Sequence, residues 1–199
     1  MRKVGLTGSI AVGKSFVCEV FRELGCIVLD SDKVARDVVA PETAGLNLLV
    51  ENFGVGILTS SRELDRKKLG AIVFSNERKR QLLNSLLHPL IFEAQVEWLE
   101  RQEANAPDGI AIVDAALMIE SGGYRRFEKL IVVWCDPTIQ LKRLMMRDEV
   151  SEVEANRIIS SQLPQEEKKN FADYLINTSG GFEAAKEETE AVYRELKRL

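Results

Sequence analysis

Five short runs along the chain are almost continuously apolar, and each is typical of a buried β-strand. They cover residues 3–7, 26–29, 109–114, 130–135 and 174–177. Strands that are apolar on both faces belong to parallel sheets whose two faces are covered by helices. Segments with helical periodicity lie between these runs, so the sequence predicts a doubly wound α/β fold with a five-stranded parallel sheet.

Two longer stretches contain helical patterns without a convincing strand. In residues 41–106, an apolar stripe stops before Pro89, and we expect this proline to open a second helix. Residues 137–171 are rich in charge and contain two amphipathic segments with a break near 149–151, as expected of a mobile lid. We therefore predict one domain over residues 1–199. Its parts are a core of about 1–40, 107–136 and 172–199, a helical insertion of about 41–106 and a lid of about 137–171.

The segment after the first run matches the phosphate-binding pattern G-x-x-x-x-G-K-S, and helical spacing follows it up to Gly25, a predicted C-cap. A strand, this loop and a helix form the setting in which backbone N–H groups bind the phosphates of a nucleoside triphosphate. The expected ATP-binding residues are Gly8, Ser9, Ile10, Ala11, Val12, Gly13, Lys14 and Ser15. We expect Lys14 to act catalytically at the β- and γ-phosphates and Ser15 to ligate Mg²⁺. The alternative is a glycine-rich turn that binds nothing.

Three carboxylates follow the predicted strands. Asp30 and Asp32 come directly after the second run, and Asp114 ends the third. One member of the first pair is expected to orient or deprotonate an attacking hydroxyl and the other to hold the acceptor, although capping of the next helix is compatible with this position. Asp114 is expected to contact Mg²⁺ and substrate, with a capping role as its alternative.

Three basic residues are further candidates. Arg143 and Arg147 lie four positions apart on one face of a predicted lid helix, where guanidinium groups would bind phosphate oxygens or remain solvated. His88 is the only histidine and is a candidate substrate-binding residue, although a capping or hydrogen-bonded core position is the more common role.

The overall composition favours some classes of protein over others. The 199 residues are 45% hydrophobic and 29% charged with a net charge of −4, which fits a globular enzyme and gives no support for nucleic-acid binding. No apolar run approaches the length of a membrane span, and the start lacks a signal-peptide pattern. Cys18, Cys26 and Cys135 form neither a disulfide framework nor a zinc pattern and are expected to be core thiols. We expect a cytoplasmic protein without nucleic-acid or membrane partners; its oligomeric state is left open.

Taken together, these motifs resemble those of the dephospho-CoA kinases. Besides the phosphate-binding loop, the resemblance rests on residues 30–36, 64–69, 72–74, 88–91, 114–120, 140–147, 157–162 and 172–177, in the family's order. It implies transfer of the ATP γ-phosphate to the ribose 3′-hydroxyl of dephospho-CoA, the last step of coenzyme A synthesis, with residues 41–106 binding the acceptor. It further implies that Asp32 activates the acceptor, Arg143 reaches the phosphates and Asn177 lies near adenine.

Two departures from the family pattern are visible. Ala116 and Met118-Ile119 stand where Pro and Leu-Phe are usual, and Val12 stands where Ser or Thr is more common. Neither change removes a chemical group that the reaction needs. The alternatives are a nucleoside or nucleoside-monophosphate kinase and a non-catalytic ATP-dependent switch protein. The guanine-binding signatures of GTPase switches do not occur in the sequence.

Overall fold

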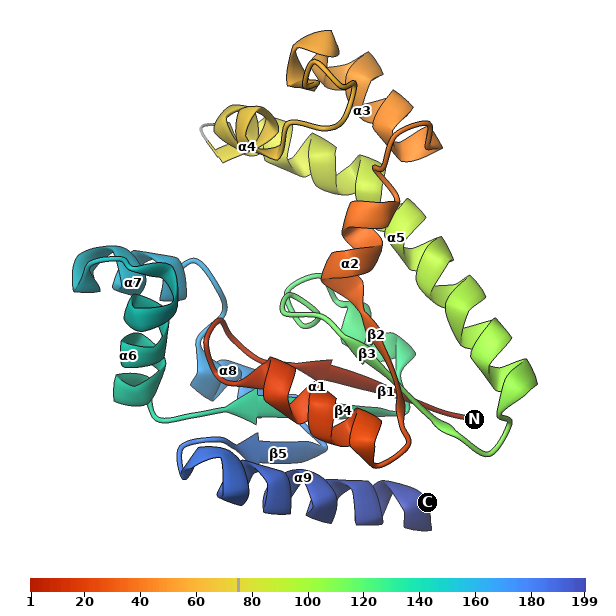
Figure 1. Cartoon of the computed structure of the whole chain (residues 1–199), viewed down its shortest axis with the longest axis vertical. Coiled ribbons are helices and arrows are strands. Elements are labelled where there is room, and N and C mark those ends of the chain that lie inside the picture. Colours follow the sequence, from red (N-terminus) through yellow and green to blue (C-terminus); the bar gives the residue numbers. More distant parts are fainter. Residues whose placement is uncertain (75) are drawn as a thin grey trace. The chain divides into compact units, whose positions relative to one another are not determined.

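The computed structural model describes residues 1–74 and 76–199 and is built around a five-stranded parallel sheet with the order β2-β3-β1-β4-β5 (Figure 1). The strands are β1 (Arg2–Thr7), β2 (Ile27–Asp30), β3 (Ile110–Asp114), β4 (Lys129–Trp134) and β5 (Tyr174–Asn177). The predicted α/β fold class and all five predicted strands are therefore confirmed, with ends that differ by one residue at most. All of β3 is buried, which explains why its sequence is apolar without alternation.

The first strand lies in the middle of the sheet. β1 pairs in parallel with β3 on one side, where Leu6 lies opposite Asp114, and with β4 on the other, where Thr7 lies opposite Val132. The chain leaves parallel strands at the same edge of the sheet, and ligands of such folds bind at that edge. The register therefore places the loop after β1 beside the carboxylate that ends β3.

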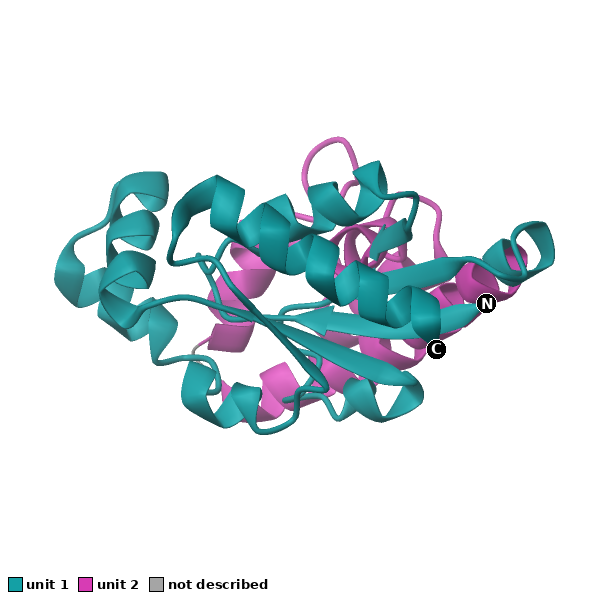
Figure 2. Ribbon diagram, turned by 90° about the horizontal axis from the view of Figure 1, so that it is seen from below, with its two compact units in different colours: residues 1–29, 102–199 teal, residues 30–101 magenta. Residues whose placement is uncertain are grey.

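The chain divides into two compact units, one formed by residues 1–29 and 102–199 and the other by residues 30–101 (Figure 2). The first unit contains the sheet with the following helices: α1 (Lys14–Glu23), α6 (Pro137–Asp148), α7 (Glu152–Ile159), α8 (Gln165–Lys169), α9 (Gly181–Arg198) and the short 3₁₀ segment η2 (Gly123–Arg126). α1 and α9 pack against each other and against the sheet, where Phe21 and Leu196 join the buried cluster around Leu6. The break near 149–151 is confirmed: α6 ends at Asp148, and Ser151 caps α7.

The end of α1 follows a standard backbone pattern. Gly25 has a φ of +87°, which favours glycine. The N–H of Gly25 bonds to the carbonyl of Arg22 at 3.0 Å, and the N–H of Cys26 bonds to that of Phe21 at 2.9 Å. These two bonds form a Schellman motif, so the expected glycine cap is confirmed.

The second unit is helical apart from the last residue of β2 and an isolated bridge between Leu58 and Leu64, over the residues that are described. Its elements are α2 (Ser31–Asp37), α3 (Ala44–Phe53), the 3₁₀ segment η1 (Val55–Ile57), α4 (Arg66–Phe74) and most of α5 (Glu77–Asn105). Its own core contains Val39, Leu49, Ile57, Leu69 and Val73. The assignment of this stretch as an acceptor-binding insertion, and of 137–171 as a lid, stays a prediction.

The prediction that Pro89 opens a second helix is wrong, because α5 runs through it as one helix of 29 residues. Proline removes one backbone hydrogen bond from a helix interior. Three leucines within residues 83–87, before the proline, pack against the core of the second unit. After it, Gln95 donates a hydrogen bond to the Ser31 hydroxyl at 3.0 Å. These contacts hold α5 on both sides of Pro89 and compensate for the backbone hydrogen bond that the proline removes.

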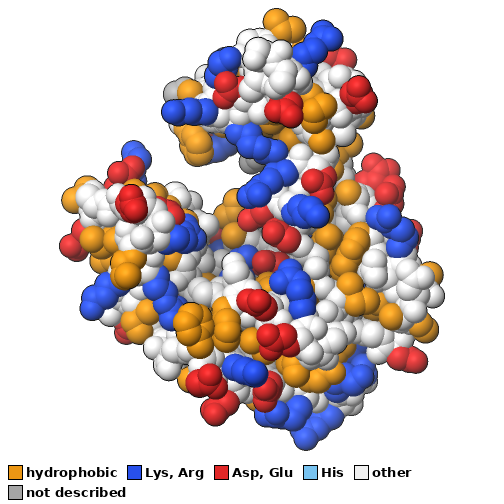
Figure 3. Space-filling view, in the orientation of Figure 1, with side chains coloured by type: hydrophobic (Ala, Val, Ile, Leu, Met, Phe, Trp, Pro, Cys, Tyr) orange, Lys and Arg blue, Asp and Glu red, His pale blue; other side chains and the backbone are white. Residues whose placement is uncertain are grey.

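On the face shown in Figure 3, basic and acidic side chains are interspersed. Over the described residues, no helix combines the length and the hydropathy needed to cross a bilayer.

Candidate functional site

The loop between β1 and α1 requires glycine at two positions. A Cβ at Gly8 would lie 2.5 Å from the carbonyl oxygen of Val133, so no larger residue fits there. Gly13 has a φ of +88° and is the N-cap of α1. Since glycine has no side chain, it cannot occupy the first N–H groups of the helix. These N–H groups can therefore bind an anion at the positive end of the ten-residue helix.

Lys14 and Asp114 form an ion pair at this loop. Their side chains are 16% and 11% exposed, so the pair is largely shielded from water. The structure thus brings together two of the predicted site residues, as expected from the pairing of Leu6 with Asp114.

The three cysteines lie in the core, as predicted: Cys18, Cys26 and Cys135 are all buried. Burial raises the pKa of the Cys26 thiol to about 12. Burial, followed by the negative charge of Asp114, raises the pKa of the Cys18 thiol well above its usual range. Burial and the Asp114 charge both disfavour the Cys18 thiolate, which is the nucleophilic form of a cysteine.

Three side chains from the carboxyl-terminal half fix the loop backbone. Gln140, which is 2% exposed, donates from Nε2 to the carbonyl of Ile10 at 2.8 Å, and Gln162 Oε1 accepts from the N–H of Ile10 at 2.8 Å. Thr178 Oγ1 donates to the carbonyl of Val12 at 2.6 Å. The sequence did not reveal these roles, because neutral side chains carry no pattern of charge or periodicity. The only signal was that Gln140 and Gln162 lie in blocks that support the family resemblance.

The two candidate arginines have different surroundings. Arg143 donates from Nη1 to Thr178 Oγ1 at 2.8 Å and from Nη2 to the Thr178 carbonyl at 2.9 Å, so it is joined to the loop through one residue. Arg147 pairs with Asp148 at 2.7 Å, and this contact raises its pKa. A phosphate contact stays a prediction for both.

Asn177 is the last residue of β5 and organises the turn into α9. Its N–H donates to Glu188 Oε2, and its Oδ1 accepts from the N–H of Ser179 at 2.9 Å. These contacts hold the residue at the same edge of the sheet as Thr178. Its predicted place near adenine is not tested by them.

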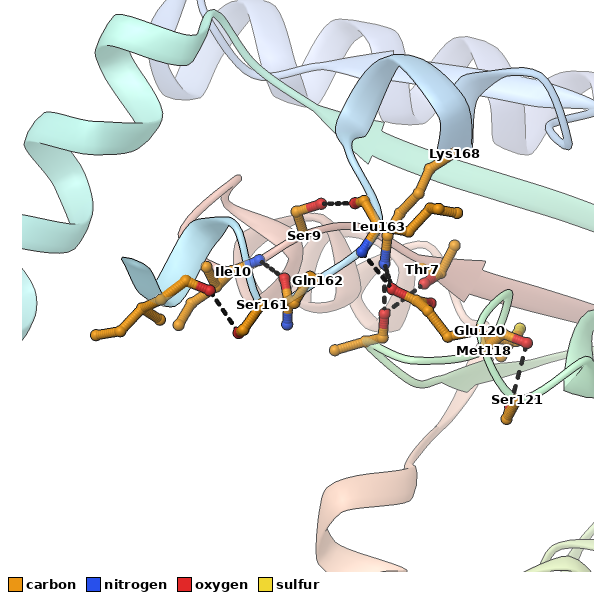
Figure 4. Close-up of polar contacts among 12 residues, drawn as sticks. Thr7, Ser9, Ile10, Met118, Glu120, Ser121, Ser161, Gln162, Leu163 and Lys168 are labelled. Atoms are coloured by element: carbon orange, nitrogen blue, oxygen red, sulfur yellow. Dashed lines mark hydrogen bonds and ion pairs between the residues drawn. The ribbon is translucent and has the colours of Figure 1, made fainter. Parts of the chain in front are cut away.

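A buried lysine lies in the same unit and was missed in the sequence. Lys168 has a side chain that is 0% exposed, and its Nζ lies 2.9 Å from Glu120 Oε1 (Figure 4). Burial lowers the pKa of Lys168, and the contact with Glu120 opposes this shift. In the sequence, Lys168 follows two glutamates and precedes another lysine, and such a charged run normally indicates a solvated surface.

Asp30, Asp32 and His88 belong to the second unit. Asp30 is the N-cap of α2 and accepts from the N–H of Asp32 at 2.8 Å, so the capping interpretation is confirmed for it. Asp32 lies in the first turn of α2 with an exposed side chain. His88 is exposed within α5. The expectation of a capping or core role for His88 is therefore wrong, because α5 continues through this position instead of ending there.

Comparison with known proteins adds to this geometry. The family model described as dephospho-CoA kinase matches residues 2–184. The dephospho-CoA kinase of Geobacillus kaustophilus is 41% identical over 198 residues, covering 98% of this chain and 97% of its own. A dephospho-CoA kinase domain-containing protein of Danio rerio is 45% identical over 181 residues, covering 90% and 79% of the two chains.

A solved structure gives the same result. The dephospho-CoA kinase from Campylobacter jejuni matches with a TM-score of 0.68 and 27% identity, over 100% of this chain and 98% of that one. Together with the loop and its Lys14–Asp114 pair, these matches establish that the chain belongs to the dephospho-CoA kinase family.

Proposed function

We propose that this chain carries out the reaction of its family, the ATP-dependent phosphorylation of dephospho-CoA in coenzyme A biosynthesis, with the ribose 3′-hydroxyl as the acceptor. The observation that carries the proposal is the phosphate-binding loop with its shielded Lys14–Asp114 pair at the edge of the sheet. A cytoplasmic location remains an expectation.

The loop supplies the ATP phosphate site in this proposal. The N–H groups at the start of α1 bind phosphate oxygens, and the positive end of the helix favours their charge. The Lys14 ammonium neutralises charge that develops on the transferred phosphoryl group. Arg143, which is held at Thr178, adds a second positive charge from α6. Arg147 and Asn177 are assigned to the nucleotide by the family resemblance.

The residues at the loop fit a magnesium ion. The Ser15 hydroxyl and the Asp114 carboxylate are hard oxygen ligands, and Mg²⁺ in kinases is held by one or two such groups together with substrate phosphates. Such an ion would neutralise charge on the ATP phosphates.

The acceptor side of the reaction is assigned to the second unit. Because Asp30 caps α2, the exposed carboxylate of Asp32 is held in the first turn of that helix. We assign Asp32 to orient the acceptor hydroxyl and to accept its proton late in the transfer. Asp30 and His88 are assigned to the acceptor-binding region.

One coupled assay tests the proposed reaction. Dephospho-CoA, pantetheine and nucleoside monophosphates are offered side by side with ATP and Mg²⁺, and ADP formation is followed. We expect ADP formation with dephospho-CoA and none with pantetheine or the nucleoside monophosphates. Turnover with a nucleoside monophosphate and none with dephospho-CoA would overturn the assignment.

The role of Asp32 is tested by Asp32→Asn, with Asp30→Asn as its control. Removal of the charge should reduce kcat by roughly 10²- to 10⁴-fold, the usual range for an acid–base group, with ATP binding nearly unchanged. Asparagine is as good an N-cap as aspartate, so Asp30→Asn should reduce kcat less than Asp32→Asn does. If Asp32→Asn turns over normally, the acceptor is activated by another group.

A further inference from the structure

Lys168 is completely shielded from water, although a buried ammonium is costly unless hydrogen bonds and an opposite charge compensate it. Both kinds of compensation are present. Nζ donates to the carbonyl of Ala116 at 2.8 Å and lies 2.9 Å from Glu120 Oε1. With its Nζ enclosed in this way, Lys168 does not contact a substrate directly, and its effect must pass through these two partners.

The carbonyl of Ala116 connects Lys168 to both sides of the Lys14–Asp114 pair. It also accepts a hydrogen bond from Thr7 Oγ1 at 3.2 Å. Thr7 is the last residue of β1, directly before the phosphate-binding loop, and Ala116 lies two positions after Asp114. A single carbonyl therefore joins α8 to the segment that enters the loop and to the segment that carries the carboxylate.

Glu120 connects Lys168 to the loop along a second route. Its Oε1 also accepts from the N–H of Leu163 at 3.1 Å. The neighbouring Gln162 accepts from the N–H of Ile10 at 2.8 Å, as Figure 4 shows. The carboxylate that neutralises Lys168 thus also fixes the segment that holds the loop backbone.

We propose that Lys168, through its ion pair with Glu120, is a positioning residue for phosphoryl transfer. It sets the place of the Asp114 carboxylate through Ala116 and the place of the loop backbone through Leu163 and Gln162. This inference rests on the proposed kinase function. A lysine that only fills space in α8 would affect stability but not the geometry of the loop.

The test replaces Lys168 with methionine, which keeps the length and apolar stem of the side chain. Lys169→Met is the matched control, because Lys169 lies next in the same helix and contacts Glu166 and Trp134 instead of the loop. We expect Lys168→Met to reduce kcat by roughly 10²-fold, as a misplacement of about 1 Å does, with the KM for ATP less affected. We expect amide hydrogen exchange in residues 8–15 to become roughly tenfold faster without a change in residues 181–198. Lys169→Met should leave both values as in the parent.

A double variant controls for a loss of folding that is caused only by the Glu120 charge left unpaired in Lys168→Met. Lys168→Met combined with Glu120→Gln removes both charges of the pair, in which only Lys168 is fully buried, so no charge is left without its partner. The double variant should melt like the parent yet keep the low kcat and the fast exchange. Parent-like kcat or exchange in the double variant would overturn the positioning role.

Different results would refute the proposed kinase function and the positioning role of Lys168. Absence of coenzyme A formation by the parent chain would refute the proposed function. Hydrogen exchange at residues 8–15 needs no turnover and decides the role of Lys168 independently. Equal exchange in the parent and in both variants that lack Lys168 would refute that role even in a fully active kinase.

Discussion

Replacement of Thr178 by valine should break the side-chain link between Arg143 of α6 and the phosphate-binding loop, while Gln140 of α6 keeps its bond to the Ile10 carbonyl. Thr178 is 3% exposed, and its hydroxyl donates to the Val12 carbonyl at 2.6 Å while it accepts from Arg143 Nη1 at 2.8 Å. Valine has almost the same shape but no hydroxyl, so the Val12 carbonyl loses this donor. A buried polar group left without its partner costs about 1–3 kcal/mol.

The second effect of the valine is smaller. Arg143 keeps its bond from Nη2 to the Thr178 backbone carbonyl at 2.9 Å, and this bond does not depend on the side chain. We therefore expect a total loss of about 2 kcal/mol in the free energy of unfolding. For a chain of this size, that loss lowers the melting temperature by about 4–8 °C. Because the loop carbonyl and the guanidinium are both less well held, kcat should fall by roughly tenfold or more.

Thr178→Ser is the control, since serine keeps the hydroxyl and loses only a methyl group. Melting temperature is measured by differential scanning calorimetry, and kcat is measured at saturating ATP for both variants. The reasoning is refuted if valine and serine give the same melting temperature and the same kcat, because the hydroxyl would then hold neither the loop nor Arg143.

Three further changes test other parts of the molecule. Lys14→Ala should reduce kcat by roughly 10³-fold or more at saturating ATP, because it removes charge stabilisation in the transition state. Activity within tenfold of the parent would contradict the assignment of residues 8–15 as an ATP phosphate-binding loop. Hydrogen exchange in residues 139–165 should slow when ATP–Mg²⁺ and acceptor bind, and unchanged exchange there, with protection of residues 8–15, would contradict the lid prediction. The Thr138 hydroxyl and then its N–H lower the pKa of the Asp136 carboxyl, which caps α6. The ionised carboxyl therefore stabilises the folded protein fully above the pKa that Asp136 has in the unfolded chain. This stabilisation is lost as the pH falls through its pKa in the folded protein. Asp136→Asn should therefore flatten the acid side of a plot of melting temperature against pH.

The sheet was predictable from the sequence because buried parallel strands need apolar side chains on both faces. β5, with the sequence Tyr-Leu-Ile-Asn, has both predicted ends correct. The continuation of α5 through Pro89 was not predictable, because it depends on leucines and on Gln95, whose partners are distant in sequence. A local rule for proline cannot include such contacts.

Some residues of the candidate site were predictable from the sequence and others were not. The loop and Asp114 are signalled by motif and by position at a strand end, and the parallel register brings Lys14 and Asp114 together. Gln140, which contacts the loop backbone, and Lys168, which contacts Ala116, have no local signal in the sequence. Their roles come from hydrogen bonds to residues more than 50 positions away in the chain.

The central place of β1 shapes the order in which the molecule folds. β1 is made before both of its partners, which begin at Ile110 and Lys129, so an apolar strand stays unpaired while the intervening residues are added. Residues 30–101 are helical, and helices rely on local contacts that form early. Once this unit has folded, less flexible chain remains to be closed, and the entropy cost of pairing β1 with β3 falls. Mutations that weaken the inserted helices should therefore slow assembly of the sheet and increase aggregation during synthesis, beyond what the stability of the finished protein indicates.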